Sequence, residues 1–172
     1  RVGRGDMAAL GSLAERHGGR VRAFSYRLLG DWHKAEDVAQ ETFLRLRQAA
    51  RNYEPQARFS TWLYRIVYNL SMDQQRRAVH APVPMDAGQF EREAPPTGDS
   101  LETAELARQV QEAVNGLPPR QKEVVLLHRY EGLSHGEICE VTGWSKSAVE
   151  SLLVRAYDNL RKKLIEYEDF VQ

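Results

Sequence analysis

The chain of 172 residues is 42% hydrophobic and 28% charged, and its 24 basic side chains balance its 24 acidic ones. This composition predicts one medium or two small globular domains and excludes a chain that is disordered as a whole. A single cysteine, Cys139, excludes an intrachain disulfide framework and favours a reducing, cytoplasmic location. No membrane insertion is expected, because there is no apolar run of about eighteen residues, and the first residues do not resemble a signal peptide.

The balanced charge is unevenly distributed along the chain. Residues 1–80 carry a net charge of +6, residues 81–117 carry −5, and residues 118–172 carry −1 with a basic stretch at 146–163. Overall neutrality argues weakly against nucleic-acid binding. Because charges act locally through a screened solvent, the basic segments remain candidates for contact with nucleic acid.

Both ends of the chain are predicted to be helical, since no useful length alternates polar and apolar residues. Before residue 80 we expect Gly18 and Gly19 to end or interrupt a first helix and Asp31 to cap a later one. The expected helices lie at about 6–17, 20–29, 32–50 and 60–77.

The segment 82–100 contains four of the seven prolines and is predicted to be a linker. The fold class is therefore all-α, with two small helical domains at 1–80 and 101–172 joined by a flexible linker at 81–100. A long loop within one domain is the alternative. The helices expected after the linker lie at about 100–115, 119–130, 134–142 and 145–167.

The segment 134–155 has the spacing of a helix-turn-helix. Ser134 stands three residues before Glu137, as in a capping box, and Gly143 suits a left-handed turn between two short helices. Cys139 is small enough to let these helices approach, which favours a structural thiol over a reactive one. The apolar face of the second helix is predicted to comprise Val149, Leu152, Leu153, Ala156, Leu160 and Leu164.

The opposite face of that second helix offers side chains that bind phosphates and base edges, and it is predicted to enter the DNA major groove. A helical hairpin with a solvated charged face is the alternative. The candidate residues are Lys146, Ser147, Glu150, Ser151, Val154 and Arg155, with Arg161, Lys162 and Lys163 further along near the DNA backbone.

The segment 51–77 gathers aromatic and basic side chains, with five of the fifteen aromatic residues between positions 53 and 68. Rings stack on bases, arginines hold phosphates and an amide reads a base edge, so the segment suits single-stranded nucleic acid, with a base pocket in the loop 52–60. Alternatively, at least two of Phe59, Trp62 and Tyr64 pack in the core. The candidate residues are Tyr53, Phe59, Trp62, Arg65, Tyr68, Asn69, Met72, Arg76 and Arg77.

The helix at 32–50 carries a second, mainly polar stripe beside its apolar one. This stripe suits a docking surface for a partner with basic side chains, although a solvated face explains it as well. It comprises Asp37, Gln40, Glu41, Leu44 and Gln48.

Three segments in this order resemble the bacterial extracytoplasmic-function (ECF) sigma factors, over about residues 8–77 and 101–165. They read GDWHKAEDVAQETFLRL, FSTWLYRIVYNLSMDQQRR and LPPRQKEVVLLHRYEGLSHGEICEVTGWSKSAVESLLVRAYDNLRKKL. The resemblance implies a sigma region 2, a short linker and a sigma region 4.

The resemblance also implies partners and roles. The polar stripe at 37–48 would dock on the β′ clamp helices of core RNA polymerase, and the FSTWLYRIVYN stretch would open the −10 promoter element. The second helix of the helix-turn-helix, with His128, would contact the −35 element while this region touches the β flap. Glu150 and Leu152 replace residues that are usual in the family, so the −35 sequence is not implied.

An anti-sigma factor is the further partner that the resemblance implies. Apolar groups on the polymerase- and DNA-facing surfaces, Leu44, Met72, Val154 and Leu152, suit a helical partner that covers both domains at once.

Two other functions remain as alternatives. A dimeric helix-turn-helix regulator would bind duplex DNA without polymerase, but it has no need of a single-strand surface. An enzyme is disfavoured because the five histidines show no ligand spacing and there is no phosphate-binding glycine loop. We expect no catalytic residues, cofactor or metal.

Overall fold

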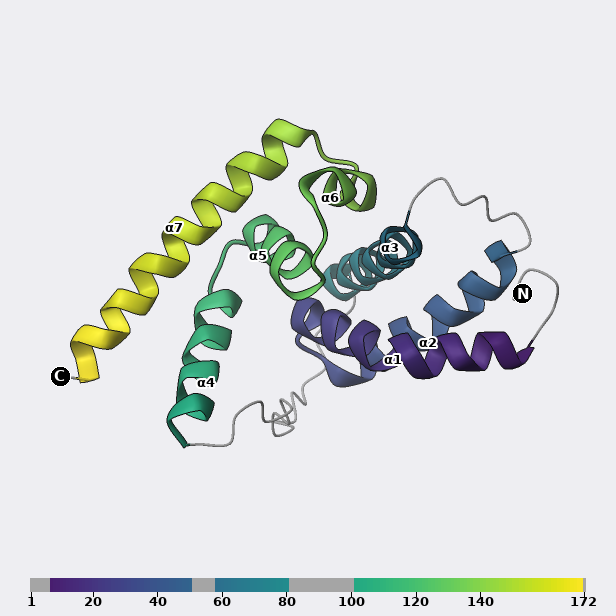
Figure 1. Cartoon of the computed structure of the whole chain (residues 1–172), viewed down its shortest axis with the longest axis horizontal. Helices are drawn as coiled ribbons and strands as arrows, with labels where there is room; N and C mark the ends of the chain where they lie inside the picture. The colour runs from purple at the N-terminus through teal and green to yellow at the C-terminus, as the bar shows by residue number, and fades with distance from the viewer. Residues whose placement is uncertain (1–6, 51–57, 81–100, 172) are drawn as a thin grey trace.

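The structure, a computed structural model, describes residues 7–50, 58–80 and 101–171. Within these ranges the regular structure is entirely helical (Figure 1), which confirms the all-α fold class. No helix in the described ranges is long and apolar enough to cross a membrane. The predicted linker at 81–100 and the loop residues 51–57 lie outside the described residues.

The first three helices pack together into what we call the N-terminal unit: α1 (Met7–Leu29), α2 (Trp32–Ala49) and α3 (Phe59–His80). Each helix contributes a buried apolar stripe at helical spacing, and burial of these stripes from water drives their association. Asp31 caps α2 as predicted, its side chain accepting a hydrogen bond from the Lys34 backbone N–H at 3.1 Å. The fully buried stripe residues include Val21 and Phe24 of α1, Val38 and Leu46 of α2, and Leu63 and Val67 of α3.

The prediction that Gly18 and Gly19 end or interrupt the first helix is wrong. α1 runs without a break from Met7 to Leu29. A glycine costs about 1 kcal/mol in a helix interior, and packing of the apolar face against a neighbouring helix outweighs such a local cost. Gly18 lies close to α2, since a Cβ added there would stand 3.8 Å from the Phe43 ring.

The remaining helices form the C-terminal unit: α4 (Leu101–Asn115), α5 (Pro119–Val125), a π-helical turn η3 (Leu126–Tyr130), α6 (His135–Thr142) and α7 (Lys146–Val171). The single helix predicted at 119–130 is therefore divided, because its last turn widens into η3. Pro119 opens α5 at the first helical position, where its missing N–H costs nothing. α7 packs against α4, α5 and α6 along one edge of the molecule (Figure 1).

The two units are in contact. α3 lies against α6, and α1 lies against η3, so the buried apolar residues of both units form one continuous cluster (Figure 1). Polar contacts cross the same boundary: the Arg20 guanidinium lies 3.2 Å from the Glu131 carboxylate, and the Thr61 hydroxyl donates to Glu137 at 2.9 Å. The C-terminal unit therefore packs against the helix that was predicted to contact single-stranded DNA.

Candidate nucleic-acid interface

The corner between α6 and α7 has the geometry of a helix-turn-helix. Ser134 and Glu137 form a reciprocal capping box at the start of α6, as the spacing predicted. Gly143 ends α6 with φ of +75°, the left-handed conformation that glycine adopts without a steric cost. The Ser145 hydroxyl then accepts a hydrogen bond from the Ala148 N–H at 3.3 Å, at the start of α7. These caps fix the direction in which α7 leaves the turn.

The predicted apolar face of α7 is confirmed for five of its six residues, while Leu164 is half-buried and lies outside the core cluster. Val149, Leu153 and Ala156 are buried, and Leu152 and Leu160 pack against the core while remaining partly exposed. Leu152 thus contributes to the core of its own unit. Cys139 is half-buried against this core, as expected for a small structural thiol.

The predicted DNA-facing side of α7 is open to solvent over its first three turns. Val154 keeps 63% of its surface exposed, although it is apolar. Glu150 lies 3.9 Å from the Lys146 ammonium and 3.8 Å from the His135 ring, so it offsets part of the positive charge on this face. All six candidates are exposed: Lys146, Ser147, Glu150, Ser151, Val154 and Arg155.

His128 lies beside this surface and contacts Tyr157 and His135, two residues that were not predicted as site residues. Its Nδ1 atom lies 3.0 Å from the Tyr157 hydroxyl, and its ring lies 5.5 Å from the His135 ring. Burial, with the nearby charges of His135 and Arg129, lowers the pKa of His128. Tyr157 stands seven residues after Glu150, so helical spacing alone was a usable signal for it.

The polar stripe of α2 is also accessible. Asp37, Gln40 and Gln48 are exposed, and Leu44 keeps 47% of its surface exposed among them. Glu41 is half-buried and accepts a hydrogen bond from Arg45 at 2.8 Å. An exposed leucine surrounded by polar and charged side chains is typical of a protein-docking surface.

The candidates on α3 divide into an exposed and a covered group. Arg65, Asn69, Arg76 and Arg77 are exposed, while Tyr68 keeps only 6% of its surface exposed. Tyr53 lies outside the described residues.

The aromatic rings that precede Asn69 on α3 are engaged in packing. Tyr64 is buried, and Phe59 and Trp62 pack partly buried against the core, with their own rings 6.1 Å apart. This agrees with the alternative in which at least two of these rings are core residues. Phe59 also contacts His17, whose pKa is lowered, chiefly by burial.

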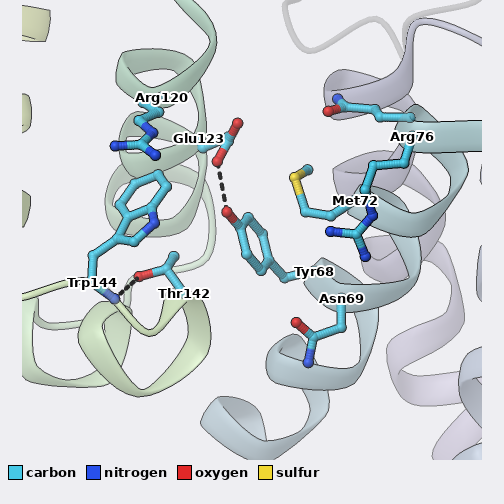
Figure 2. A pocket seen from close by; sticks show the side chains of 9 residues that line it. Tyr68, Asn69, Met72, Arg76, Arg120, Glu123, Thr142 and Trp144 are labelled. Carbon is cyan, nitrogen blue, oxygen red and sulfur yellow. Dashed lines mark hydrogen bonds between the residues drawn. The ribbon is translucent and has the colours of Figure 1, made fainter. Parts of the chain in front are cut away.

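An open pocket of about 480 Å³ lies between α3 and the C-terminal unit (Figure 2). The Tyr68 hydroxyl donates a hydrogen bond of 2.7 Å to Glu123, and the Tyr68 ring meets the Trp144 ring edge-on at 6.4 Å. The Arg120 guanidinium stands 5.3 Å from the centre of the Trp144 ring. The lining residues are Tyr68, Asn69, Met72, Gln75, Arg76, Arg120, Glu123, Thr142 and Trp144.

Two carboxylates at this boundary are largely removed from water. Burial raises the pKa of Glu123, although the Tyr68 hydrogen bond and the Arg120 charge oppose the rise. Burial likewise raises the pKa of Glu131, opposed by a hydrogen bond from Tyr64 and by Arg20 and Arg27. Neither residue was predicted from the sequence, yet Glu123 stands four residues before Leu127 on a buried helical face, where a carboxylate is unexpected.

No group of three or more His, Cys, Asp or Glu side chains that could hold a metal ion occurs among the described residues. The described surfaces instead offer exposed arginines, an amide and polar side chains of the kinds that bind nucleic acid.

Two family models match the chain. The description "Sigma-70 region 2" matches residues 13–80, and "Sigma-70, region 4" matches residues 107–160. The first match contains α3 and most of the N-terminal unit, and the second contains the helix-turn-helix.

Similar proteins agree with these matches. The ECF RNA polymerase sigma factor SigE of Mycolicibacterium smegmatis is 36% identical over 95% of this chain, which spans 65% of that protein's length. The ECF RNA polymerase sigma factor SigW of Bacillus subtilis is 30% identical, with 95% of this chain and 93% of that protein covered.

A solved structure of CnrH, in complex with the cytosolic domain of CnrY, is 30% identical with a TM-score of 0.67, covering 96% of this chain and 93% of CnrH. With both family models matched in order and a full-length relative at this level of identity, the chain belongs to the ECF RNA polymerase sigma factors.

Proposed function

We propose that the chain directs core RNA polymerase to promoters and has no catalytic activity of its own. In this proposal the polar stripe of α2 docks on the β′ clamp helices, and α3 with the loop 52–60 recognises and opens the −10 element. The first turns of α7, with His128, read the −35 element in the major groove, and the C-terminal unit touches the β flap. No cofactor or metal takes part.

The observation that carries the proposal is the exposed polar face at the start of α7, above a buried apolar face. Lys146, Ser151 and Arg155 are open to solvent on the first turns of the second helix of a helix-turn-helix, the part that enters the major groove in this motif. Lysine and arginine reach phosphates and guanine edges, and serine bonds to bases or phosphates. The exposed Asn69 and Arg65 on α3 support the second half of the proposal, because amides and guanidinium groups bind unpaired bases and the sugar-phosphate backbone.

The domain division follows these roles. We assign residues 1–80 to core binding and −10 recognition, 81–100 to the linker, and 101–172 to −35 recognition. A cytoplasmic location follows from the proposed partner, since the polymerase and promoter DNA are found there.

A second protein partner is part of the proposal. An anti-sigma factor would cover the apolar side chains left exposed on the polymerase- and DNA-facing surfaces, of which Leu44 and Val154 are the most accessible. Contact with both units at once would raise avidity without new chemistry, and it would exclude the polymerase. Met72 and Leu152 are partly buried against the core, so they would contribute less to this surface.

Run-off transcription with purified core polymerase tests the proposal. We expect the chain to bind core polymerase and to start transcription from a subset of promoters in a genomic library, while core alone starts none specifically. The alternative, a dimeric regulator, would bind duplex DNA with no core present and would not restore initiation. Duplex binding without core, together with no transcript, would overturn the proposal in favour of the regulator.

A further inference from the structure

The surface of α3 that is proposed to hold unpaired bases is partly covered by the same chain. Tyr68 is 6% exposed, its hydroxyl is bonded to Glu123, and its ring meets Trp144 (Figure 2). A ring with only 6% of its surface exposed has no face open for a base to stack on, and the Tyr68 hydroxyl is already bonded to the C-terminal unit. Binding of a base to Tyr68 therefore requires the two units to separate.

Further contacts hold the two units together at other points. The Arg20 guanidinium pairs with the Glu131 carboxylate, whose side chain is only 3% exposed. The Arg27 guanidinium lies 4.5 Å above the centre of the Tyr130 ring, and Thr61 donates to Glu137. Because these contacts involve residues of both α1 and α3, the packing of the C-terminal unit against α3 does not depend on the Tyr68 hydrogen bond alone.

The chemistry of the boundary suits reversible closure. Although apolar residues meet there, the polar contacts comprise an ion pair, a cation–π contact and hydrogen bonds, which water can replace when the units part. A carboxylate such as Glu131 is costly to bury without a partner, and both its ion-pair partner Arg20 and the nearby charge of Arg27 lie on α1 of the other unit. When the two units separate, water solvates the Glu131 carboxylate and replaces the ion pair that is lost.

We infer that the free chain inhibits itself, because its C-terminal unit closes over the strand-opening surface of its N-terminal unit and must move away before a promoter is opened. The inference rests on the proposed function for the role of α3, but the closure itself is a property of the free chain. The α2 stripe stays accessible in the closed form, but docking of both units on core polymerase at the same time requires them to separate. The apparent affinity for core polymerase is therefore the intrinsic affinity multiplied by the fraction of chains that are open.

The test is a charge reversal at the boundary. Arg20→Glu replaces the partner of Glu131 with a like charge, while Arg20 is itself 59% exposed and lies outside the surfaces proposed to bind DNA or polymerase. Arg16→Glu is the matched control, since Arg16 is exposed one turn earlier on α1 and has no ion pair with the described residues of the C-terminal unit. Both variants are measured as full chains by small-angle X-ray scattering and by their affinity for core polymerase.

We expect Arg20→Glu to have a larger radius of gyration than the wild type and to bind core polymerase about fivefold more tightly or better, as the open fraction grows. Arg16→Glu should match the wild type in both measurements. Circular dichroism confirms that the variants remain folded. If Arg20→Glu unfolds, Thr61→Val takes its place, because it removes the hydrogen bond to Glu137 with little change of shape, and a smaller shift in the same direction is expected.

An unchanged radius of gyration and an unchanged core affinity in the folded boundary variant would overturn the self-inhibition. If the proposed function is wrong, neither the wild type nor any variant will bind core polymerase. The scattering comparison will still show whether the free chain is closed.

Discussion

Asn69 and Arg65 are exposed on α3, one turn apart, and Asn69 lines the open pocket together with Tyr68. An amide can read the edge of an unpaired base, and a guanidinium can hold a phosphate or stack on a ring. Neither side chain contributes to the buried stripe of α3, so replacing them should alter binding without removing core packing.

We predict that Asn69→Ala combined with Arg65→Ala leaves core binding unchanged but lowers open-complex formation roughly tenfold, as expected for losing an interaction worth about 1–3 kcal/mol. Permanganate reactivity of unpaired thymines measures the opening. Arg16→Ala, an exposed arginine on α1, is the control and should open promoters normally. Thymine reactivity equal to that of the wild type in the double variant would show that this face does not contact the opened strand.

Arg155 and Lys162 lie two turns apart on α7, and both are exposed. Arg155 is within the part of the helix that is proposed to enter the major groove, while Lys162 lies further along, where it would meet the DNA backbone.

Arg155→Ala is predicted to change which −35 sequences are used, with a cost of about 1–3 kcal/mol at the contacted base pair. Lys162→Ala should weaken transcription by a similar factor at all promoters and reduce its dependence on salt. Transcription from a promoter library with randomised −35 sequences separates the two effects. An Arg155→Ala profile identical to that of the wild type would mean that the register assigned to α7 on the DNA is wrong.

At the scale of elements, the direction of α7 depends on one turn. Gly143 has φ of +75°, and the Gly143 N–H donates to the Cys139 carbonyl at 2.8 Å, which completes the end of α6. A side chain at this position clashes with the neighbouring carbonyl in the left-handed conformation.

Gly143→Ala is therefore predicted to destabilise the protein by about 1–2 kcal/mol, measured by urea unfolding. Gly136→Ala is the matched control, because Gly136 is helical, has open space around it and has no positive φ. The control should be neutral or slightly stabilising. Equal stability of the two variants would indicate that α6 ends in another conformation.

At the scale of the whole molecule, closure of the two units is linked to protons. The pKa of Glu123 and of Glu131 is raised by burial above its ordinary value of 4.5, so the closed form takes up protons. The facing groups are Tyr68 and Arg120 for Glu123, and Tyr64, Arg20 and Arg27 for Glu131. Glu137 has a lowered pKa, but its largest cause is the Ser134 backbone N–H within its own unit, which remains after opening.

The sign follows from the direction of these shifts. The contribution of the two carboxyls to closure is fully present below about pH 4.5, where they are neutral in both forms, and is lost as the pH rises through their raised pKa values. The chain should therefore open as the pH rises.

We predict that the radius of gyration of the free chain increases between about pH 5 and pH 8, and that Glu123→Gln with Glu131→Gln removes most of this increase. Gln imitates the neutral carboxyl and still accepts the Tyr68 hydrogen bond. His17 and His128 also have lowered pKa values, but each contacts a ring of its own unit and is present in both proteins, so its effect cancels in the comparison. A pH response that is equal in the two proteins would contradict this assignment.

Most of the helices, most of their caps, the buried faces and the family could be read from local patterns in the sequence. Asp31, Ser134 and Gly143 act on backbone groups at most four residues away, and the apolar stripe of α7 repeats every three or four residues, so both signals are readable locally. For the same reason the exposed residues of α2 and α7 could be selected as candidate sites before the fold was known.

The continuity of α1 and the burial of Tyr68 depend instead on packing between helices. Gly18 and Gly19 favour a break locally, but α1 packs against α2 and stays helical. Tyr68 shares a helical face with Asn69 and Met72, yet it bonds to Glu123, 55 residues away in the chain. Such a contact depends on how two units dock, and docking depends on the summed shape and charge of both surfaces, which no local pattern of residues contains.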